Sequence, residues 1–157
     1  TTEIDQQVRE IQQGLAEKTI ACQHRTMQAW DIPSRISACE DCHGTSQVPL
    51  LPGLRQLCDW YPKWLRFKQH PDSCKHCAGR GWVLSDSSIE TGLAALKEGF
   101  GAVALECYWH NADKFKPAGY ELRLCVLKDN RPVWVTEVNR CPRLAFWLAV
   151  EELVKHP

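Results

Sequence analysis

Two short cysteine motifs constrain this chain more than any other feature of its sequence. Residues 39–44 read Cys-Glu-Asp-Cys-His-Gly, and residues 74–79 read Cys-Lys-His-Cys-Ala-Gly. In a CxxC turn both sulfurs can face one point, and the glycine that follows lets the chain turn back without a Cβ clash. Together the motifs supply the four thiolates of a closed tetrahedral zinc site. We therefore predict one zinc ion per chain, bound by Cys39, Cys42, Cys74 and Cys77.

Three alternatives to this zinc site are buried cysteines without metal, a redox-active CxxC and an iron–sulfur cluster. Redox motifs of the thioredoxin type open a helix after a strand, whereas glycine follows both motifs here. An iron–sulfur cluster also uses four thiolates, so the motifs do not choose between zinc and iron. His43 and His76 lie beside the motifs, and we expect them to form hydrogen bonds or face solvent. Cys22 and His24 form another ligand-like pair without a matching partner, so we expect no second metal there.

The overall composition indicates a globular protein with no strong attraction to polyanions. A length of 157 residues suits one compact domain or two small ones. The formal net charge is zero, so no overall field draws the chain toward nucleic acid or an anionic membrane. Nine cysteines, an odd number, fit reduced thiols and metal better than a disulfide framework. No apolar run approaches the roughly 20 residues that span a bilayer, and the polar start lacks a signal-peptide pattern, so we expect a cytoplasmic protein.

Periodicity and motifs divide the chain into three segments. Residues 1–30 hold an amphipathic helix over residues 2–18 and a linker. Residues 31–86 hold the zinc-ribbon module with a helical insertion, and residues 87–157 form an α-β-β-β-α domain. The predicted fold class is therefore α+β, with a four-cysteine zinc ribbon beside a layer that contains a three-stranded antiparallel sheet.

The first helix has a narrow apolar stripe. Thr2 and Asp5 form a weak capping box at its start. The stripe covers only two heptads, which favours packing on the body of the protein, and a homodimer through this helix is the alternative. The residues of the stripe are Ile4, Val8, Ile11 and Leu15.

The insertion between the two motifs has a roughly helical apolar pattern of its own. Pro62 argues against one unbroken helix, so a short helix or two turns is the better prediction. The apolar positions are Leu54, Leu57, Cys58, Tyr61 and Leu65.

The C-terminal segment changes from helical to alternating periodicity. Ser87 and Glu90 form a capping box that opens a helix ending near Gly99. A hairpin turn is expected over residues 128–131, and Pro142 suits the first turn of a last helix. The two helices are expected to cover one face of the sheet. The three predicted strands centre on residues 103–109, 120–126 and 133–136.

Four further cysteines are expected to be small core residues, because free cysteine is among the most buried residue types. Cys107 and Cys125 fall on strand positions that support this expectation. The other two are Cys58 and Cys141.

Residues 74–81, Cys-Lys-His-Cys-Ala-Gly-Arg-Gly, resemble the CxxCxGxG repeat of the zinc region in DnaJ-type chaperones. Residues 39–46 match this repeat except that Ser46 replaces the final glycine. Those chaperones carry four repeats and two zinc ions, so two repeats imply one zinc. The resemblance implies a zinc fold without implying co-chaperone activity, and the chain has no J-domain His-Pro-Asp signature. Short proteins with two such repeats include assembly chaperones for other proteins.

The element order of the C-terminal half resembles two families. A double-stranded RNA-binding domain would carry a lysine cluster at the start of its last helix. Residues 139–144 hold two arginines and no lysine there. The phage-associated ABA sandwich family ends in an aromatic strand, a proline-led turn and an Ala/Leu-rich helix, which residues 132–153 resemble more closely. This resemblance implies a phage or prophage accessory protein acting in the cytoplasm of its host.

No nucleotide loop, nucleophile elbow or HExxH motif is present, so we predict that the chain is not an enzyme. A hydrolase would need a second metal, and His110 near Asp113 more simply indicates a turn.

Residues 51–85 carry an excess of four positive charges with interleaved aromatics, a composition typical of protein interfaces and of single-strand nucleic-acid binding. We predict a protein partner, with a nucleic-acid-binding regulator as the alternative; packing of these aromatics in the core is the simpler account. The candidate partner-binding residues are Arg55, Trp60, Tyr61, Lys63, Trp64, Arg66, Phe67 and Lys68.

Overall fold

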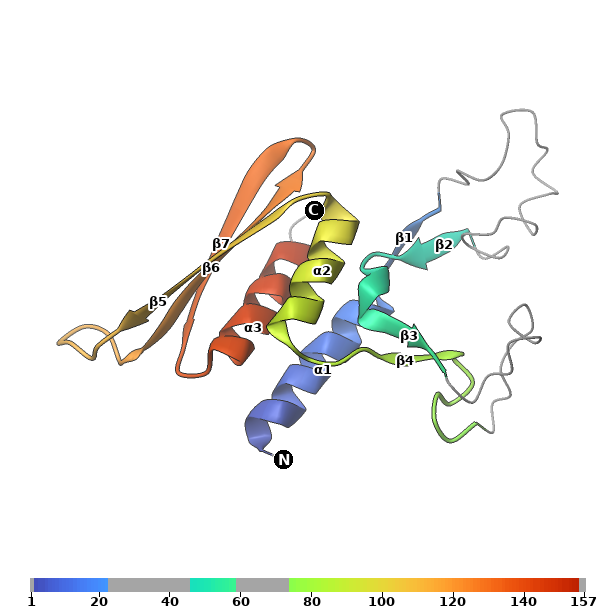
Figure 1. Cartoon of the computed structure of the whole chain (residues 1–157), viewed down its shortest axis with the longest axis horizontal. Coiled ribbons are helices and arrows are strands. Elements are labelled where there is room, and N and C mark those ends of the chain that lie inside the picture. The colour runs from blue at the N-terminus through green and yellow to red at the C-terminus, as the bar shows by residue number, and fades with distance from the viewer. Residues whose placement is uncertain (1, 23–45, 59–73, 156–157) are drawn as a thin grey trace.

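The computed structural model describes residues 2–22, 46–58 and 74–155 (Figure 1). The helices are α1 (Glu3–Glu17), α2 (Ile89–Phe100) and α3 (Pro142–Lys155), with a 3₁₀ turn η2 (Pro52–Leu54). The strands are β1 (Thr19–Ala21), β2 (Gln47–Pro49), β3 (Arg55–Leu57), β4 (Trp82–Leu84), β5 (Val103–His110), β6 (Gly119–Lys128) and β7 (Arg131–Asn139). This arrangement confirms a mixed helix and sheet fold. In these described ranges no helix is both long and apolar enough to cross a membrane.

Strands β5, β6 and β7 form one antiparallel sheet in that order. The predicted turn between β6 and β7 is confirmed, since Lys128 pairs directly with Arg131. Its two central residues, Asp129 and Asn130, have φ angles of 53° and 61°. A two-residue type I′ turn requires positive φ at both positions, and aspartate and asparagine tolerate it better than most residues.

Both long helices of the C-terminal half lie on one face of this sheet, as predicted (Figure 1). Helix α3 packs on β6 and β7, and α2 packs on β5 and β6. Helix α1 packs on α3. The buried face of the sheet contributes Leu122, Leu124 and Val126 to the same core that holds Phe146 and Trp147 of α3. One hydrophobic core thus joins the first helix to the last.

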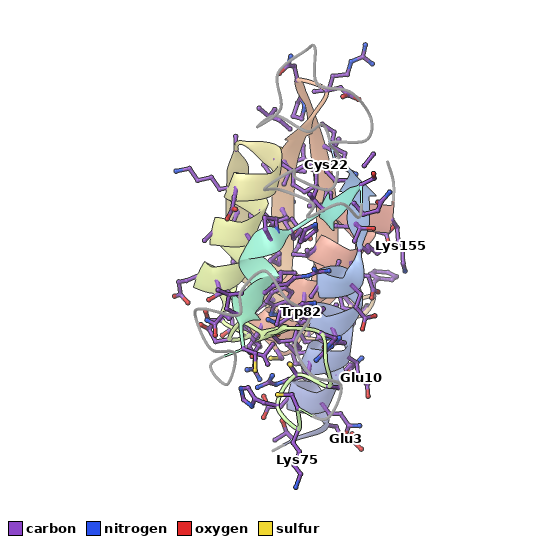
Figure 2. All side chains as sticks on the ribbon, turned by 90° about the vertical axis from the view of Figure 1, so that its right-hand side faces the viewer. Glu3, Glu10, Cys22, Lys75, Trp82 and Lys155 are labelled. Carbon is purple, nitrogen blue, oxygen red and sulfur yellow. The ribbon has the colours of Figure 1, made fainter. Side chains whose placement is uncertain are left out.

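Two small hairpins lie on the other side of the helices from the sheet (Figure 1). Strands β1 and β2 form one, and β3 and β4 form the other. In Figure 2 Cys22, which follows β1, and Trp82 of β4 are labelled on them. The predicted helical insertion is wrong for the described residues up to Cys58, because Arg55–Leu57 pairs with β4 instead. Leu57 is 74% exposed, so the helical apolar pattern through it does not mark a buried face.

Helix α1 begins and packs as its sequence indicates. The Thr2 hydroxyl accepts a hydrogen bond from the Asp5 N–H at 3.3 Å, and the Asp5 carboxylate accepts one from the Thr2 N–H at 3.4 Å. This confirms the capping box. Val8 and Leu15 are fully buried, which confirms that the apolar stripe packs within the chain. The buried Gln12 side chain donates to the carbonyl oxygens of Ser85 and Asp86 at 2.9 and 3.0 Å.

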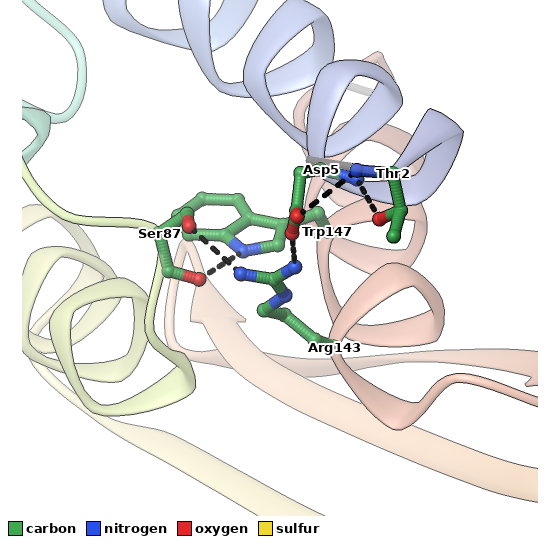
Figure 3. Close-up of polar contacts among 5 residues, drawn as sticks. All are labelled: Thr2, Asp5, Ser87, Arg143 and Trp147. Carbon is green, nitrogen blue, oxygen red and sulfur yellow. Dashed lines mark hydrogen bonds and ion pairs between the residues drawn. The ribbon is translucent and has the colours of Figure 1, made fainter.

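Arg143 of α3 connects the starts of α1 and α2 (Figure 3). Its guanidinium pairs with the Asp5 carboxylate and donates to the Ser87 hydroxyl at 3.2 Å. The hydrogen bond from Arg143 is the main reason that the pKa of Asp5 is lowered. Trp147, one turn further along α3, donates its indole N–H to the Ser87 carbonyl at 3.0 Å.

The predicted capping box at Ser87 and Glu90 is wrong by one residue. Ser88 is the N-cap of α2, and its hydroxyl accepts a hydrogen bond from the Thr91 N–H at 3.2 Å. Ser87 instead contacts α3, which explains the shift. The Asp86 carboxylate accepts bonds from the Ser88 N–H and the Thr91 hydroxyl. Hydrogen bonds from the side chains of Ser88 and Thr91, together with the one from the Ser88 N–H, lower the pKa of Asp86 to about 2.

Gly92 of α2 packs directly against the side chains of Phe146 and Trp147 of α3. A Cβ atom there would lie 2.2 Å from Cε1 and 2.6 Å from Cζ of Phe146. We expect Gly92→Ala to lower the free energy of unfolding by about 2 kcal/mol, because overpacking outweighs the roughly 1 kcal/mol that alanine gains over glycine in a helix.

The matched control is Gly14→Ala in α1, where a Cβ atom meets nothing within 4 Å. This substitution should raise the free energy of unfolding by about 0.5–1 kcal/mol. Urea unfolding followed by circular dichroism measures both. Equal stabilisation by the two substitutions would contradict the close contact at Gly92.

Candidate metal centre

The β3–β4 hairpin positions three cysteines at one end. Cys58 follows β3 directly, and its N–H donates to the Gly81 carbonyl at 3.0 Å, which extends the ladder by one step. Cys74 and Cys77 precede β4 in a tight turn, in which the Ala78 N–H donates to the Cys74 carbonyl at 2.8 Å. The pairing of the two strands therefore brings Cys58 next to the CxxC motif.

The turn after Cys77 explains why the motif needs its glycines. Gly79 and Gly81 have φ angles of 85° and 80°, a region that glycine occupies without strain. Ala78 also has a positive φ of 52°. This path brings the Gly81 N–H to 3.4 Å from the Cys77 sulfur. An N–H donor at this position stabilises the thiolate form that binds metal.

The three sulfur atoms are spaced as ligands of one metal ion would be. The sulfurs of Cys58 and Cys74 are 3.9 Å apart, and all three lie within 4.8 Å of one another. Tetrahedral zinc with Zn–S bonds of about 2.3 Å places its sulfurs about 3.8 Å apart. Cys58 and Cys77 are 2% and 0% exposed. The group formed by Cys58, Cys74 and Cys77 could hold a metal ion.

This group agrees only partly with the ligand set predicted from sequence. Cys74 and Cys77 lie together, but Cys58 joins them, although we expected it to be a core residue. Cys39 and Cys42 lie outside the described residues, so a site shared by the two motifs stays a prediction. A signal for Cys58 exists in the sequence. It lies 16 residues before its CxxC motif, much as Cys22 lies 17 residues before the other.

Two arginines pack beside the cysteine group on one tryptophan. The guanidinium carbons of Arg55 and Arg80 each lie 4.4 Å from the ring centroid of Trp82. Arg55 also donates to the Ala16 carbonyl at 2.7 Å, and Arg80 donates to the Cys77 carbonyl at 3.1 Å. Burial lowers the pKa of Arg55, and the charge of Arg80 lowers it further.

Of the eight candidate partner-binding residues, only Arg55 lies within the described residues, and its contacts tie the hairpin to α1. The other seven lie outside the described residues and stay a prediction. They are Trp60, Tyr61, Lys63, Trp64, Arg66, Phe67 and Lys68.

The cysteines of the sheet differ in burial. Cys125 is buried, as predicted, but Cys107 is exposed, so the prediction for it is wrong. Cys107 pairs with the buried Leu122 and so lies on the helix-covered face, but it belongs to the edge strand β5, whereas α3 packs on β6 and β7. Cys125 pairs with Trp134 on the opposite face of the sheet. Cys141, which precedes α3, is half-buried. None of these three joins the metal-binding group.

The second face of the sheet is a surface that sequence reasoning missed. In the described part of the chain no helix packs on it, and several large apolar side chains are exposed there. Alternation along each strand would have identified them, but only once the covered face was known. They are Tyr108, Leu127, Trp134 and Val138.

Asp113 lies in a turn, as predicted, and His110 is the last residue of β5. The Asp113 carboxylate accepts hydrogen bonds from the N–H groups of Phe115 and Lys116, both at 2.7 Å. These bonds lower the pKa of Asp113. The His110 Nε2 atom lies 3.6 Å from the Glu121 carboxylate on the neighbouring strand β6.

Comparisons of the chain with protein-family models, with curated proteins and with solved structures gave no match. The similarity of the cysteine motifs to DnaJ-type repeats, and of the C-terminal half to a phage family, therefore stays a prediction.

Proposed function

We propose that this chain is a zinc-binding protein whose metal closes the base of a recognition loop for another protein. The observation that carries the proposal is the 3.9 Å separation of the Cys58 and Cys74 sulfurs. These two cysteines flank residues 59–73, the proposed recognition loop. This segment holds the seven candidate partner-binding residues that follow Arg55. A metal ion bound by both would fix the two ends of this segment together.

Zinc suits this site because thiolates bind it strongly and it has no redox chemistry of its own. Closing a loop of this length costs conformational entropy that two three-residue strands do not offset. Structural zinc in small peptides contributes about 10–16 kcal/mol of apparent binding free energy. The metal would therefore supply the stability that the short hairpin lacks.

The composition of residues 59–73 favours a protein partner over nucleic acid. The segment contains two tryptophans, a tyrosine and a phenylalanine, residue types that are enriched in the cores of protein interfaces. The segment has three basic and two acidic side chains, which leaves a small net charge. Two of the other basic residues of the insertion, Arg55 and Arg80, pack on Trp82. The positive excess available to contact phosphates is thus smaller than the sequence suggested.

An affinity-capture experiment tests this function. The zinc-loaded chain is immobilised, and captured proteins are identified by mass spectrometry and then purified to measure Kd. The variant with Trp60→Ala and Trp64→Ala should weaken binding of the purified partner at least 10-fold, since hot-spot aromatics contribute about 2 kcal/mol or more.

Trp134→Ala is the matched control, because Trp134 lies on the uncovered face of the sheet and is 51% exposed. This variant should bind as the wild type does. If Trp134→Ala abolishes binding and the loop variant does not, the recognition loop is the wrong surface. Capture of no protein, together with tight binding of RNA or DNA that weakens steeply with salt, would replace the proposal with a nucleic-acid-binding function.

A further inference from the structure

The β1–β2 hairpin repeats the β3–β4 hairpin residue by residue. Each contains three antiparallel pairs, and Thr19 pairs with Pro49 as Arg55 pairs with Leu84. Beyond the last pair, the N–H of Cys22 donates to the carbonyl of Ser46 at 2.9 Å. The equivalent bond in the other hairpin joins the Cys58 N–H to the Gly81 carbonyl at 3.0 Å. By position in the ladder, Cys22 is therefore the counterpart of Cys58.

The two hairpins also match at their bases. The Leu50 N–H donates to the Lys18 carbonyl at 2.9 Å, and the Ser85 N–H donates to the Leu54 carbonyl at 3.0 Å. In each case the bond joins the residue before the first strand to the residue after the second.

The two hairpins have similar backbone conformations at the position where their cysteine motifs differ in sequence. Ser46 replaces the last glycine of the first motif, yet its φ angle is 61°, close to the 80° of Gly81. A serine rarely adopts this conformation, so its presence indicates that the same turn geometry is imposed at both positions.

The spacing of the cysteines follows the same repeat. Cys22 precedes its CxxC motif by 17 residues and Cys58 precedes its own by 16. From the last cysteine of each motif, four residues lead to Ser46 in one hairpin and to Gly81 in the other. Each hairpin thus has one cysteine after its first strand and two shortly before its second.

We propose that the β1–β2 hairpin is a second metal-binding unit, in which Cys22 binds a zinc ion together with Cys39 and Cys42. These two cysteines lie outside the described residues and are assigned by their place in the sequence repeat alone. The chain then binds two zinc ions, one in each hairpin, in place of the single shared site expected from sequence. Figure 2 supports separate sites, since Cys22 lies near the top of the molecule and Lys75, next to Cys74, at the bottom. The inference rests on the proposed function only in that the β3–β4 hairpin binds metal.

Metal stoichiometry of the full chain is the test. The protein is purified under reducing conditions, loaded with zinc, freed of excess metal and measured by native mass spectrometry and elemental analysis. We expect two zinc ions per wild-type chain, one in Cys22→Ser, one in Cys58→Ser and none in the double variant. Cys107→Ser, an exposed cysteine outside both hairpins, should retain two.

The wild-type measurement alone decides the proposal, even if a variant fails to fold. One zinc per chain overturns it, whether Cys22→Ser removes that ion, as in a shared site, or leaves it in place. No zinc in the wild type would mean that the proposed function has failed as well. Loading with Co²⁺ adds an independent readout, because its thiolate charge-transfer absorbance should fall by about half in each single variant.

Discussion

Cys77→Ser should remove the metal ion from the β3–β4 hairpin and unfold that hairpin while the helices and the large sheet stay folded. Cys77 is fully buried, and its sulfur accepts the N–H of Gly81, so the site depends on it for both metal binding and turn geometry. A serine hydroxyl is not an adequate zinc ligand at neutral pH. Structural zinc contributes about 10–16 kcal/mol of apparent binding free energy in small peptides. The packing of this short hairpin offers no contribution of that size, so we expect the hairpin to unfold without the metal.

Elemental analysis and limited proteolysis measure the two parts of this result. The variant should contain less zinc than the wild type, and protease should cut it rapidly between residues 55 and 84. Its circular dichroism should change little, because α1, α2, α3 and β5–β7 share a core that contains none of the three cysteines. The control Cys107→Ser should match the wild type in both assays. A Cys77→Ser protein with unchanged zinc and unchanged protease resistance would rule out the metal centre.

Trp147→Ala should lower the free energy of unfolding of the whole protein by about 3–5 kcal/mol. Trp147 is fully buried, and its ring packs edge-on against Phe146 with centroids 5.2 Å apart. Its indole N–H donates to the carbonyl of Ser87 at 3.0 Å, and the substitution leaves that carbonyl without this donor. The expected loss combines the cavity, the lost ring contact and the lost hydrogen bond. For a chain of this length the midpoint of thermal unfolding should fall by roughly 10 °C.

Trp134→Ala is the control for the loss of a tryptophan as such. Trp134 lies on the uncovered face of the sheet and is half-exposed, so its substitution should cost about 1 kcal/mol or less. Chemical and thermal unfolding of both variants, followed by circular dichroism, give the comparison. Equal losses of stability would show that the described packing between α2 and α3 does not hold the protein together.

The parts of the fold that sequence predicted well depend on local signals. The meander of β5, β6 and β7 could be predicted because each strand is long enough for alternation to be visible. The turn at Asp129 and Asn130 could be predicted because its geometry selects those residue types. The first helix has both an apolar stripe and a capping box, and the two signals agree.

The parts that sequence missed depend on contacts between distant segments. The four small strands have three residues each, too few to show alternation, so the pairing that brings Cys58 to the metal-binding group had no local signature. Ser87 and Ser88 are equally good caps by sequence, and only the contacts of Ser87 with α3 decide between them. The exposure of Cys107 follows from which strands α3 covers, a property of the tertiary arrangement.

The hydrogen bonds at the bases of the two hairpins have a consequence for how this chain can vary. The chain enters the first hairpin at Lys18 and leaves it at Leu50, which is hydrogen-bonded to Lys18. It enters the second hairpin at Leu54 and leaves it at Ser85, which is hydrogen-bonded to Leu54. The two ends of each hairpin are therefore adjacent to one another. Insertions or deletions within a hairpin do not require the helices and strands before and after it to move. Residues 23–38 and 59–73 are therefore the places where length and sequence can diverge, or be replaced by a foreign peptide, without disturbing the core.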